Sequence, residues 1–264
     1  VVKSFHMNRR TFFSASASAT LGRPAASAAR KGVFELRYFR LRNTRANQAK
    51  RTSDFLANAI LPAAGRAGIG PLGFFSGAIA VDSPFILMLA GFPSLAGMEQ
   101  AREKLAADKD YQKARDEFNS AADLNYMRME SSLLVGFESM PAIEPPPGGA
   151  ERPPRVFELR VYESSNTSTL ARKIKMFDEG EIALFRKCGI LPVFFGETIA
   201  GPNMPNLTYM VAFDDMAARD KAWQTFVNHP EWKQMSTRPE YADADIVSNI
   251  SNSVLRPLSF SPIR

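Results

Sequence analysis

The sequence contains little of the chemistry from which disulfide and metal sites are built. It has one cysteine, Cys188, and two histidines, His6 and His229, among 264 residues. A single cysteine excludes an intramolecular disulfide, and a site with several His or Cys ligands is excluded within one chain. Only a site made of carboxylates alone stays open. Phosphate-binding glycine loops, nucleophile elbows and HExxH stretches are absent as well. We therefore expect no metal and no cofactor.

Long apolar runs are also missing. No stretch approaches the roughly 20 residues of a membrane-spanning helix, so we expect no membrane span. Hydrophobic residues make up 45% of the chain and charged residues 23%, which is typical of a globular protein. The length fits one large domain or two small ones.

Basic charge is concentrated at the N-terminus. Six Lys or Arg residues and no acidic residue precede Glu35. After Met7, the expected start, residues 9–13 read RRTFF, followed by a Ser/Ala stretch with small residues near Ala28. The pattern resembles a twin-arginine export signal and predicts a periplasmic or otherwise exported protein. A mitochondrial presequence, which is also rich in Arg and Ser, is the alternative.

Removal of this segment changes the charge balance. Without residues 1–28 the chain has 29 basic and 27 acidic residues, a net charge of +2. The formal net charge of +6 for the whole chain thus belongs largely to the N-terminal segment. We therefore expect no nucleic-acid partner.

An internal repeat organises the rest of the sequence. VFELR occurs at residues 33–37 and again at 156–160, 123 positions later, and Asn43-Thr44 matches Asn166-Thr167 at the same offset. The offset then becomes 121 for apolar, Gly and Pro positions over some 80 residues, including Gly68/Gly189, Pro71/Pro192, Phe74/Phe195 and Phe92/Phe213. Agreement of this kind indicates duplication of a whole fold.

A proline-rich segment separates the two copies. Residues 141–154 contain six prolines, and proline fixes φ and cannot donate to a β-ladder, which predicts an extended linker. The expected division is an export signal or unstructured N-terminus in residues 1–31, a first half in 32–140, the linker in 141–154 and a second half in 155–264.

Each copy has the pattern strand, helix, strand, strand, helix, strand. In the second copy we expect a helix capped by Asn166 or Thr167, strands at Leu191–Ala200 and Leu207–Phe213, and a last strand within 245–255. A second helix capped by Asp214 or Asp215 should place Met216, Trp223, Phe226 and Val227 on one face. In the first copy, helices are expected near 45–66, kinked by Pro62, and 95–118.

The βαββαβ order predicts an α+β fold with an antiparallel sheet and both helices on one face. Such a half leaves its other sheet face bare. Two halves in one chain can press these faces together, so we predict two ferredoxin-like halves that form one intramolecular α/β barrel. The duplication thus predicts an internal pseudo-dimer, and further homo-oligomerisation stays open.

The first strand of each copy carries the candidate ligand-binding residues. Alternate side chains share a face, so two sets form: Glu35, Arg37 and Phe39, and Glu158, Arg160 and Tyr162. Their apolar neighbours Phe34, Leu36, Phe157 and Leu159 should meet the helices. The Glu–Arg–aromatic sets would then face the barrel interior, where two arginines could bind a carboxylate. Alternatively, the Glu and Arg side chains pair with one another and fix strand register.

Three other polar residues have a plainer interpretation. Glu197 is a further candidate for a pocket carboxylate, but at a strand end it should be solvated. His229 could act as a general base or haem ligand, but it precedes Pro230 and should instead cap a helix or lie at the surface. Cys188 at a helix end should be inert packing.

The starts VFELRYF and VFELRVY, the helix ends GRAGI and FRKCGI, and the second-helix segments DKDYQKA and NHPEW resemble the NIPSNAP family. The resemblance covers nearly the whole mature chain and implies the dimeric α/β-barrel superfamily. It does not imply one function, because that superfamily includes cofactor-free monooxygenases, haem-degrading enzymes, peroxidases, isomerases and stress proteins.

Two functional hypotheses follow, and they leave open whether the chain is an enzyme. In the first, an exported binding protein holds a small apolar or carboxylate-bearing ligand inside the barrel. In the second, a cofactor-independent monooxygenase-like enzyme uses Arg37 and Arg160 to stabilise an oxyanion and Tyr162 or Glu158 to move a proton.

Overall fold

The computed structural model describes residues 30–42, 47–148, 152–242 and 246–264. The predicted export signal falls almost wholly within residues 1–29 and so lies outside the described residues. Within the described part, no helix is long and apolar enough to cross a membrane. No group of three or more His, Cys, Asp or Glu side chains in that part could hold a metal ion.

The two halves repeat one order of elements. The first consists of β1 (Val33–Arg40), α1 (Gln48–Phe55), the π-helix η1 (Leu56–Ile60), α2 (Leu61–Ala67), β2 (Leu72–Ile79), β3 (Phe85–Phe92), α3 (Leu95–Ala107), α4 (Lys109–Asn119) and β4 (Arg128–Gly136). The second consists of β5 (Val156–Glu163), α5 (Thr167–Met176), the π-helix η2 (Phe177–Glu181), α6 (Ile182–Lys187), β6 (Leu191–Ala200), β7 (Asn206–Phe213), α7 (Met216–Asn228), α8 (Pro230–Ser236), the short 3₁₀ helix η3 (Pro239–Tyr241) and β8 (Asn249–Pro257).

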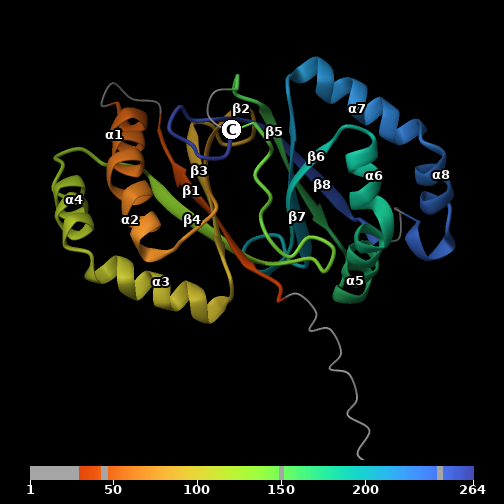
Figure 1. The fold of residues 1–264 in the computed structure, drawn as a ribbon, viewed down its shortest axis with the longest axis horizontal. Coiled ribbons are helices and arrows are strands. Elements are labelled where there is room, and N and C mark those ends of the chain that lie inside the picture. Colours follow the sequence, from red (N-terminus) through yellow and green to blue (C-terminus); the bar gives the residue numbers. More distant parts are fainter. Residues whose placement is uncertain (1–29, 43–46, 149–151, 243–245) are drawn as a thin grey trace, which may run out of the picture.

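The eight strands form one closed antiparallel barrel in the order β1-β3-β2-β8-β5-β7-β6-β4. Two ladders, β2 with β8 and β4 with β6, join the halves, so neither half keeps a free sheet edge. Figure 1 shows the strands between two helical layers, with α1–α4 on one side and α5–α8 on the other. The predicted α+β class and intramolecular barrel are confirmed.

The barrel interior is shared by both halves. Residues from all eight strands meet there in one apolar cluster, which includes Phe34, Leu36, Phe157 and Leu159. Ile143 from the proline-rich segment and Ile263 from the C-terminal tail belong to the same cluster. Their side chains lie close to the space above Gly91 and Gly73, where any larger residue would crowd them. These two segments therefore fill one end of the barrel.

The helical segments begin where the sequence predicts but are interrupted. Asn166 caps α5 and Asp215 caps α7. The expected first-copy helix over 95–118 is broken at Asp108, whose side chain caps α4. His229 caps α8 in the same way, accepting a hydrogen bond from the Glu231 amide at 3.2 Å. The helical role expected for His229 is confirmed.

Both long helical segments contain a π-helix, 121 residues apart. η1 ends just before Pro62, but η2 contains no proline. Pro62 alone therefore does not explain the irregularity. The predicted inner face of α7 is partly wrong: Val227 is 51% exposed, and Ala222 is buried beside Phe226 instead.

Candidate functional site

The candidate residues of β1 and β5 face the helices, not the barrel interior, so the expected orientation was wrong. Tyr162 packs in the apolar cluster under α5–α7, and Phe39 packs in the cluster under the first-half helices. Phe34 and Phe157, which alternate with these residues, lie inside the barrel. The alternation itself was correct. The two faces of the strand were assigned the wrong way round. The barrel interior, which apolar surface from both halves closes, is as apolar as the contact with the helices, so apolarity alone does not distinguish the two sides.

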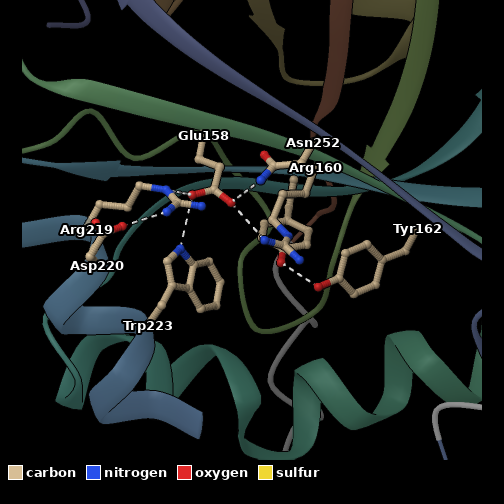
Figure 2. Close-up of polar contacts among 8 residues, drawn as sticks. Glu158, Arg160, Tyr162, Arg219, Asp220, Trp223 and Asn252 are labelled. Atoms are coloured by element: carbon tan, nitrogen blue, oxygen red, sulfur yellow. Dashed lines mark hydrogen bonds and ion pairs between the residues drawn. The ribbon is translucent and has the colours of Figure 1, made fainter. Parts of the chain in front are cut away.

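Glu158 is the centre of the second-half cluster (Figure 2). The carboxylate is fully buried and accepts four hydrogen bonds. Oε1 accepts from Arg160 Nη1 and from Asn252 Nδ2, each at 2.7 Å. Oε2 accepts from Arg219 Nε at 2.6 Å and from Trp223 Nε1 at 3.0 Å. β5, β8 and α7 are thus tied together at one buried charge.

These bonds decide the protonation state of Glu158. Burial alone would raise its pKa, but the Arg219 hydrogen bond and the Arg160 charge outweigh burial, and the pKa is lowered. The carboxylate stays ionised at neutral pH, with all its strong acceptor positions occupied. Such a group positions its neighbours; it does not suit a general base.

Arg160 is held over aromatic rings. Its guanidinium carbon lies 5.0 Å from the Trp223 ring centroid and 5.5 Å from that of Tyr162, within the range of cation–π attraction. Its Nε is buried and has no hydrogen-bond partner in the described part of the chain. The Tyr162 hydroxyl is also occupied, because Tyr209 donates to it at 3.0 Å. Burial raises the pKa of Tyr209 well above its usual 10.0.

A buried ion pair lies beside the tyrosines. Lys173 of α5 and Glu181 of η2, both almost completely buried, lie 3.1 Å apart. The Lys173 ammonium lies 4.8 Å from the Phe177 ring centroid and 5.6 Å from that of Trp232. The pair spans the π-helix and fixes the segment that covers Tyr162.

The first-half set has fewer partners. Arg37 donates to one Glu35 oxygen at 2.7 and 3.0 Å, and Ser131 donates to the same oxygen at 2.8 Å. Phe39 makes an edge contact with Tyr126. In both halves the Glu forms an ion pair with the Arg two residues later, which is the structural alternative to a ligand-binding role.

A pocket that the sequence did not predict lies in the open end of the barrel. It has a volume of about 510 Å³, within the range of small-molecule sites. Leu36, Leu159, Val161 and Phe85 supply apolar surface. The polar lining comes from strand ends and hairpin loops of both halves: Tyr38, Arg40, Asp82, Glu130, Ser132, Thr198, Asn203, Asn206, Thr208, Ser251, Asn252 and Ser253. We call it the mouth pocket.

Two of the three charged residues that line the mouth pocket, Arg40 and Glu130, compensate each other, whereas Asp82 has no ion-pair partner among the described residues. Arg40 donates to Glu130 at 2.9 Å, and Arg128 binds the other Glu130 oxygen at 2.6 Å. The Arg40 guanidinium also lies 4.3 Å from the Tyr38 ring centroid. Asn206, buried at 1% exposure, uses both ends of its amide within the protein.

Four hydroxyls of the mouth pocket are free of such bonds. Within the described residues, the side chains of Tyr38, Ser132, Ser251 and Ser253 have no hydrogen-bond partner. Burial is the main cause that raises the pKa of Tyr38 to about 12, so its hydroxyl keeps its proton. The pocket can therefore offer several neutral hydrogen-bonding groups above an apolar floor.

Glu197 and Cys188, the remaining residues considered from the sequence, lie in the structure as expected. Glu197 is exposed on β6, as expected. Cys188 is a buried free thiol whose pKa is raised by burial, which agrees with inert packing.

An eight-stranded barrel built from two βαββαβ halves, with helices outside, defines a tandem α/β-barrel protein of the dimeric α/β-barrel type. The NIPSNAP family model matches residues 34–139 and 157–262, one match for each half. The chain belongs to the NIPSNAP family. No curated protein sequence matches the chain.

Solved structures share the fold at low sequence identity. A candidate monooxygenase from Fusobacterium nucleatum is 10% identical, with a TM-score of 0.57 over 86% of this chain and 93% of that chain. A candidate monooxygenase from Lactobacillus acidophilus is 12% identical, with a TM-score of 0.56 over 86% and 94%. A NIPSNAP family protein of unknown function from Agrobacterium tumefaciens is 18% identical, with a TM-score of 0.37 over 42% and 94%.

Proposed function

We propose that this NIPSNAP protein binds a small, uncharged and largely apolar ligand with hydrogen-bonding oxygens in the mouth pocket. The observation that carries the proposal is a group of four hydroxyls without hydrogen-bond partners among the described residues, in a space of about 510 Å³ that Leu36 and Leu159 also line. Hydroxyls that are not used by the protein can donate to or accept from the oxygens of a ligand. An apolar ligand body would bury surface against the floor.

The pocket favours the uncharged form of the ligand over a carboxylate. The arginine at its wall, Arg40, shares Glu130 with Arg128. Arg37 and Arg160, the arginines expected in the interior, lie on the helix side of the sheet. A carboxylate in the mouth pocket would therefore lose hydration without gaining a free cation.

The alternative is a monooxygenase-like enzyme, in keeping with the names given to two of the structural relatives. The groups expected to move a proton in that mechanism are Glu158 and Tyr162. Glu158 already accepts four hydrogen bonds and Tyr162 accepts one. We favour binding over catalysis for this reason.

The test uses prodan, an uncharged naphthalene ketone whose emission shifts to the blue in apolar sites. We expect saturable binding to the wild-type protein, and at least tenfold weaker binding to Ser253→Phe, which fills the pocket wall. Ser248→Phe, on an exposed residue before β8 that does not line the pocket, is the matched control and should bind as the wild type does. Equal affinity of Ser253→Phe and wild type, or no saturable binding at all, would contradict the proposal.

We also propose that residues 1–31 direct export by the twin-arginine route. The paired Arg9 and Arg10 before Phe12-Phe13 and the charge asymmetry of the segment support this.

A further inference from the structure

The two halves surround their buried glutamates in the same way on one side. Helices α3 and α7 begin and end 121 residues apart, and so do strands β4 and β8. Ser131 of β4 therefore corresponds to Asn252 of β8, and each donates a hydrogen bond to Oε1 of the glutamate on the first strand of its half. Arg37 and Arg160 each donate to the same Oε1 at 2.7 Å. The Oε1 side is thus common to both halves.

The Oε2 side differs, because two donors of the second half have no counterpart in the first. Oε2 of Glu158 accepts hydrogen bonds from Arg219 and Trp223 of α7. At the offset of 121 residues, the corresponding residues of α3 are Met98 and Arg102. The thioether of Met98 has no hydrogen to donate. Arg102 is exposed and makes no hydrogen bond or ion pair within the described part of the chain.

Glu35 is left with an open acceptor. Its side chain is 5% exposed, and its three hydrogen bonds, from Arg37 and Ser131, all go to Oε1. Its Oε2 accepts none from any described residue. A buried oxygen without a donor costs free energy, because it has lost water without gaining a hydrogen bond. A bound group that donates to Oε2 would recover this loss.

A cleft of about 750 Å³ lies beside Glu35, between the outer face of the sheet and helices α3 and α4. On its sheet side are Arg37, which binds Glu35, and Leu133, which lies opposite Glu35 in the ladder of β1 and β4. On its helix side are Met98 and Arg102, the two residues that replace the second-half donors. The cleft is therefore open where the donors are missing. We call it the first-half cleft.

The charges that line the first-half cleft favour a cation over an anion. Arg37 and Arg115 each form an ion pair with a nearby carboxylate. Glu99 and Glu103 also line the cleft and are exposed, and neither has an ion-pair partner among the described residues. Two unpaired carboxylates thus lie near one unpaired guanidinium, that of Arg102. A bound cation would gain from this balance and a bound anion would not.

The second half also indicates the shape that fits. The Trp223 ring centroid lies 5.0 Å from the guanidinium carbon of Arg160, within the range of cation–π attraction, and the indole N–H reaches the carboxylate. In the described first half, no aromatic ring makes such a contact with Arg37. Leu105 and Tyr111, both half-buried, line the cleft and could contact a flat ring.

We propose that the first-half cleft binds a cationic aromatic amine whose ring carries an N–H donor, as in the indole amines. The ring N–H donates to Oε2 of Glu35, as Trp223 does in the second half. The ring lies over the guanidinium of Arg37. The ammonium group lies toward the exposed carboxylates of Glu99 and Glu103. The site is on the opposite face of the sheet from the mouth pocket, so it does not depend on the function proposed there.

The test is calorimetric titration of the full chain with tryptamine and two analogues. We expect tryptamine to bind the wild type. 1-Methyltryptamine, whose ring nitrogen has no hydrogen, should bind at least tenfold more weakly, and so should indole-3-propionate, whose tail is a carboxylate. Absence of tryptamine binding, or equal affinity for tryptamine and either analogue, would overturn the proposal.

A double variant tests the origin of the cleft. Met98→Arg with Arg102→Trp restores the second-half donors, which should bond Glu35, close the cleft and abolish tryptamine binding. Gln100→Trp, on an exposed α3 residue that does not line the cleft, is the matched control and should bind tryptamine as the wild type does. Circular dichroism should show both variants folded. Undiminished tryptamine binding to the folded double variant, or an equal loss in Gln100→Trp, would contradict the assignment of the site.

Discussion

Trp223 Nε1 of α7 donates a hydrogen bond to Oε2 of Glu158 at 3.0 Å. This bond joins the outer helix to a fully buried carboxylate on β5, and it is possible only because the Glu–Arg face of the strand looks toward the helices. This contact makes Glu158 unsuitable as a base. It also makes Glu158 a structural link between β5 and α7 in the second half.

Loss of that contact should reduce stability. Trp223→Phe keeps most of the ring but removes the donor, and a hydrogen bond to a charged group contributes about 1.5–3 kcal/mol. We expect the free energy of unfolding in urea to fall by about that amount. Gln224→Leu, on the exposed side of the same helix, should change it by less than about 0.5 kcal/mol. An equal effect of the two substitutions would contradict a structural role for the bond.

The ionisation of Glu158 predicts a pH dependence. Its pKa in the folded protein lies below the ordinary value of 4.5, so its contribution is present above pH 4.5 and is lost as the pH falls through the folded pKa. The difference in unfolding free energy between wild type and Glu158→Gln should therefore shrink below pH 4.5. A difference that stays constant from neutral pH to pH 3 would show that the carboxylate is not stabilised as an anion.

Tyr38 should affect ligand binding more than stability. Its hydroxyl has no protein partner among the described residues, so Tyr38→Phe should change the unfolding free energy by less than about 0.5 kcal/mol. Prodan affinity should fall severalfold, because the keto oxygen loses a donor. In an ultraviolet titration, Tyr38 and Tyr241 of the wild type should ionise near pH 12, and Tyr38→Phe should lose one of these two ionisations. Unchanged prodan affinity in Tyr38→Phe would remove the hydroxyl from the binding site.

The buried ion pair should be costly to break on one side. Lys173→Met leaves Glu181 buried near apolar rings, and loss of one partner of a buried pair costs about 3–5 kcal/mol. The matched control is Lys50→Met in the first half, where the lysine side chain is 66% exposed and pairs with Asp54 at the surface. That change should cost less than about 1 kcal/mol. Urea unfolding of both variants makes the comparison, and equal losses would contradict it.

The export proposal has its own test. Residues 1–31 fused to a folded fluorescent reporter should deliver it to the periplasm of a bacterium with a twin-arginine system. Substitution of Arg9 and Arg10 by lysine should keep the reporter in the cytoplasm. Delivery of the reporter to mitochondria in a eukaryotic cell, with no bacterial export, would favour the presequence alternative.

The fold could be predicted from the sequence because the residues that recur in the two copies include helix caps and glycines, which set the backbone geometry. Asn166 and Asp215 cap helices where expected. Gly189 has a φ of 82° at the end of α6, a conformation that favours glycine. The repeated strand pattern, together with the need to cover a bare sheet face, was enough to predict the closed barrel.

The face of each strand could not be predicted in the same way. Glu35 and Leu36 alternate correctly, but alternation does not say which side is the interior when both sides are covered by apolar surface. The deciding residues are distant in sequence. Glu158 is satisfied by Arg219 and Asn252, which lie 61 and 94 residues away. The mouth pocket was missed because Tyr38 and its neighbours form a site only when strand ends of both halves meet.

The most direct test of the account is a crystal structure of the protein with prodan bound. We predict prodan in the mouth of the barrel, between Leu36 and Leu159, with its keto oxygen within hydrogen-bond distance of Tyr38 or one of the pocket serines. Prodan between the sheet and α7, beside Arg160 and Glu158, would contradict the central claim that the barrel mouth is the binding site.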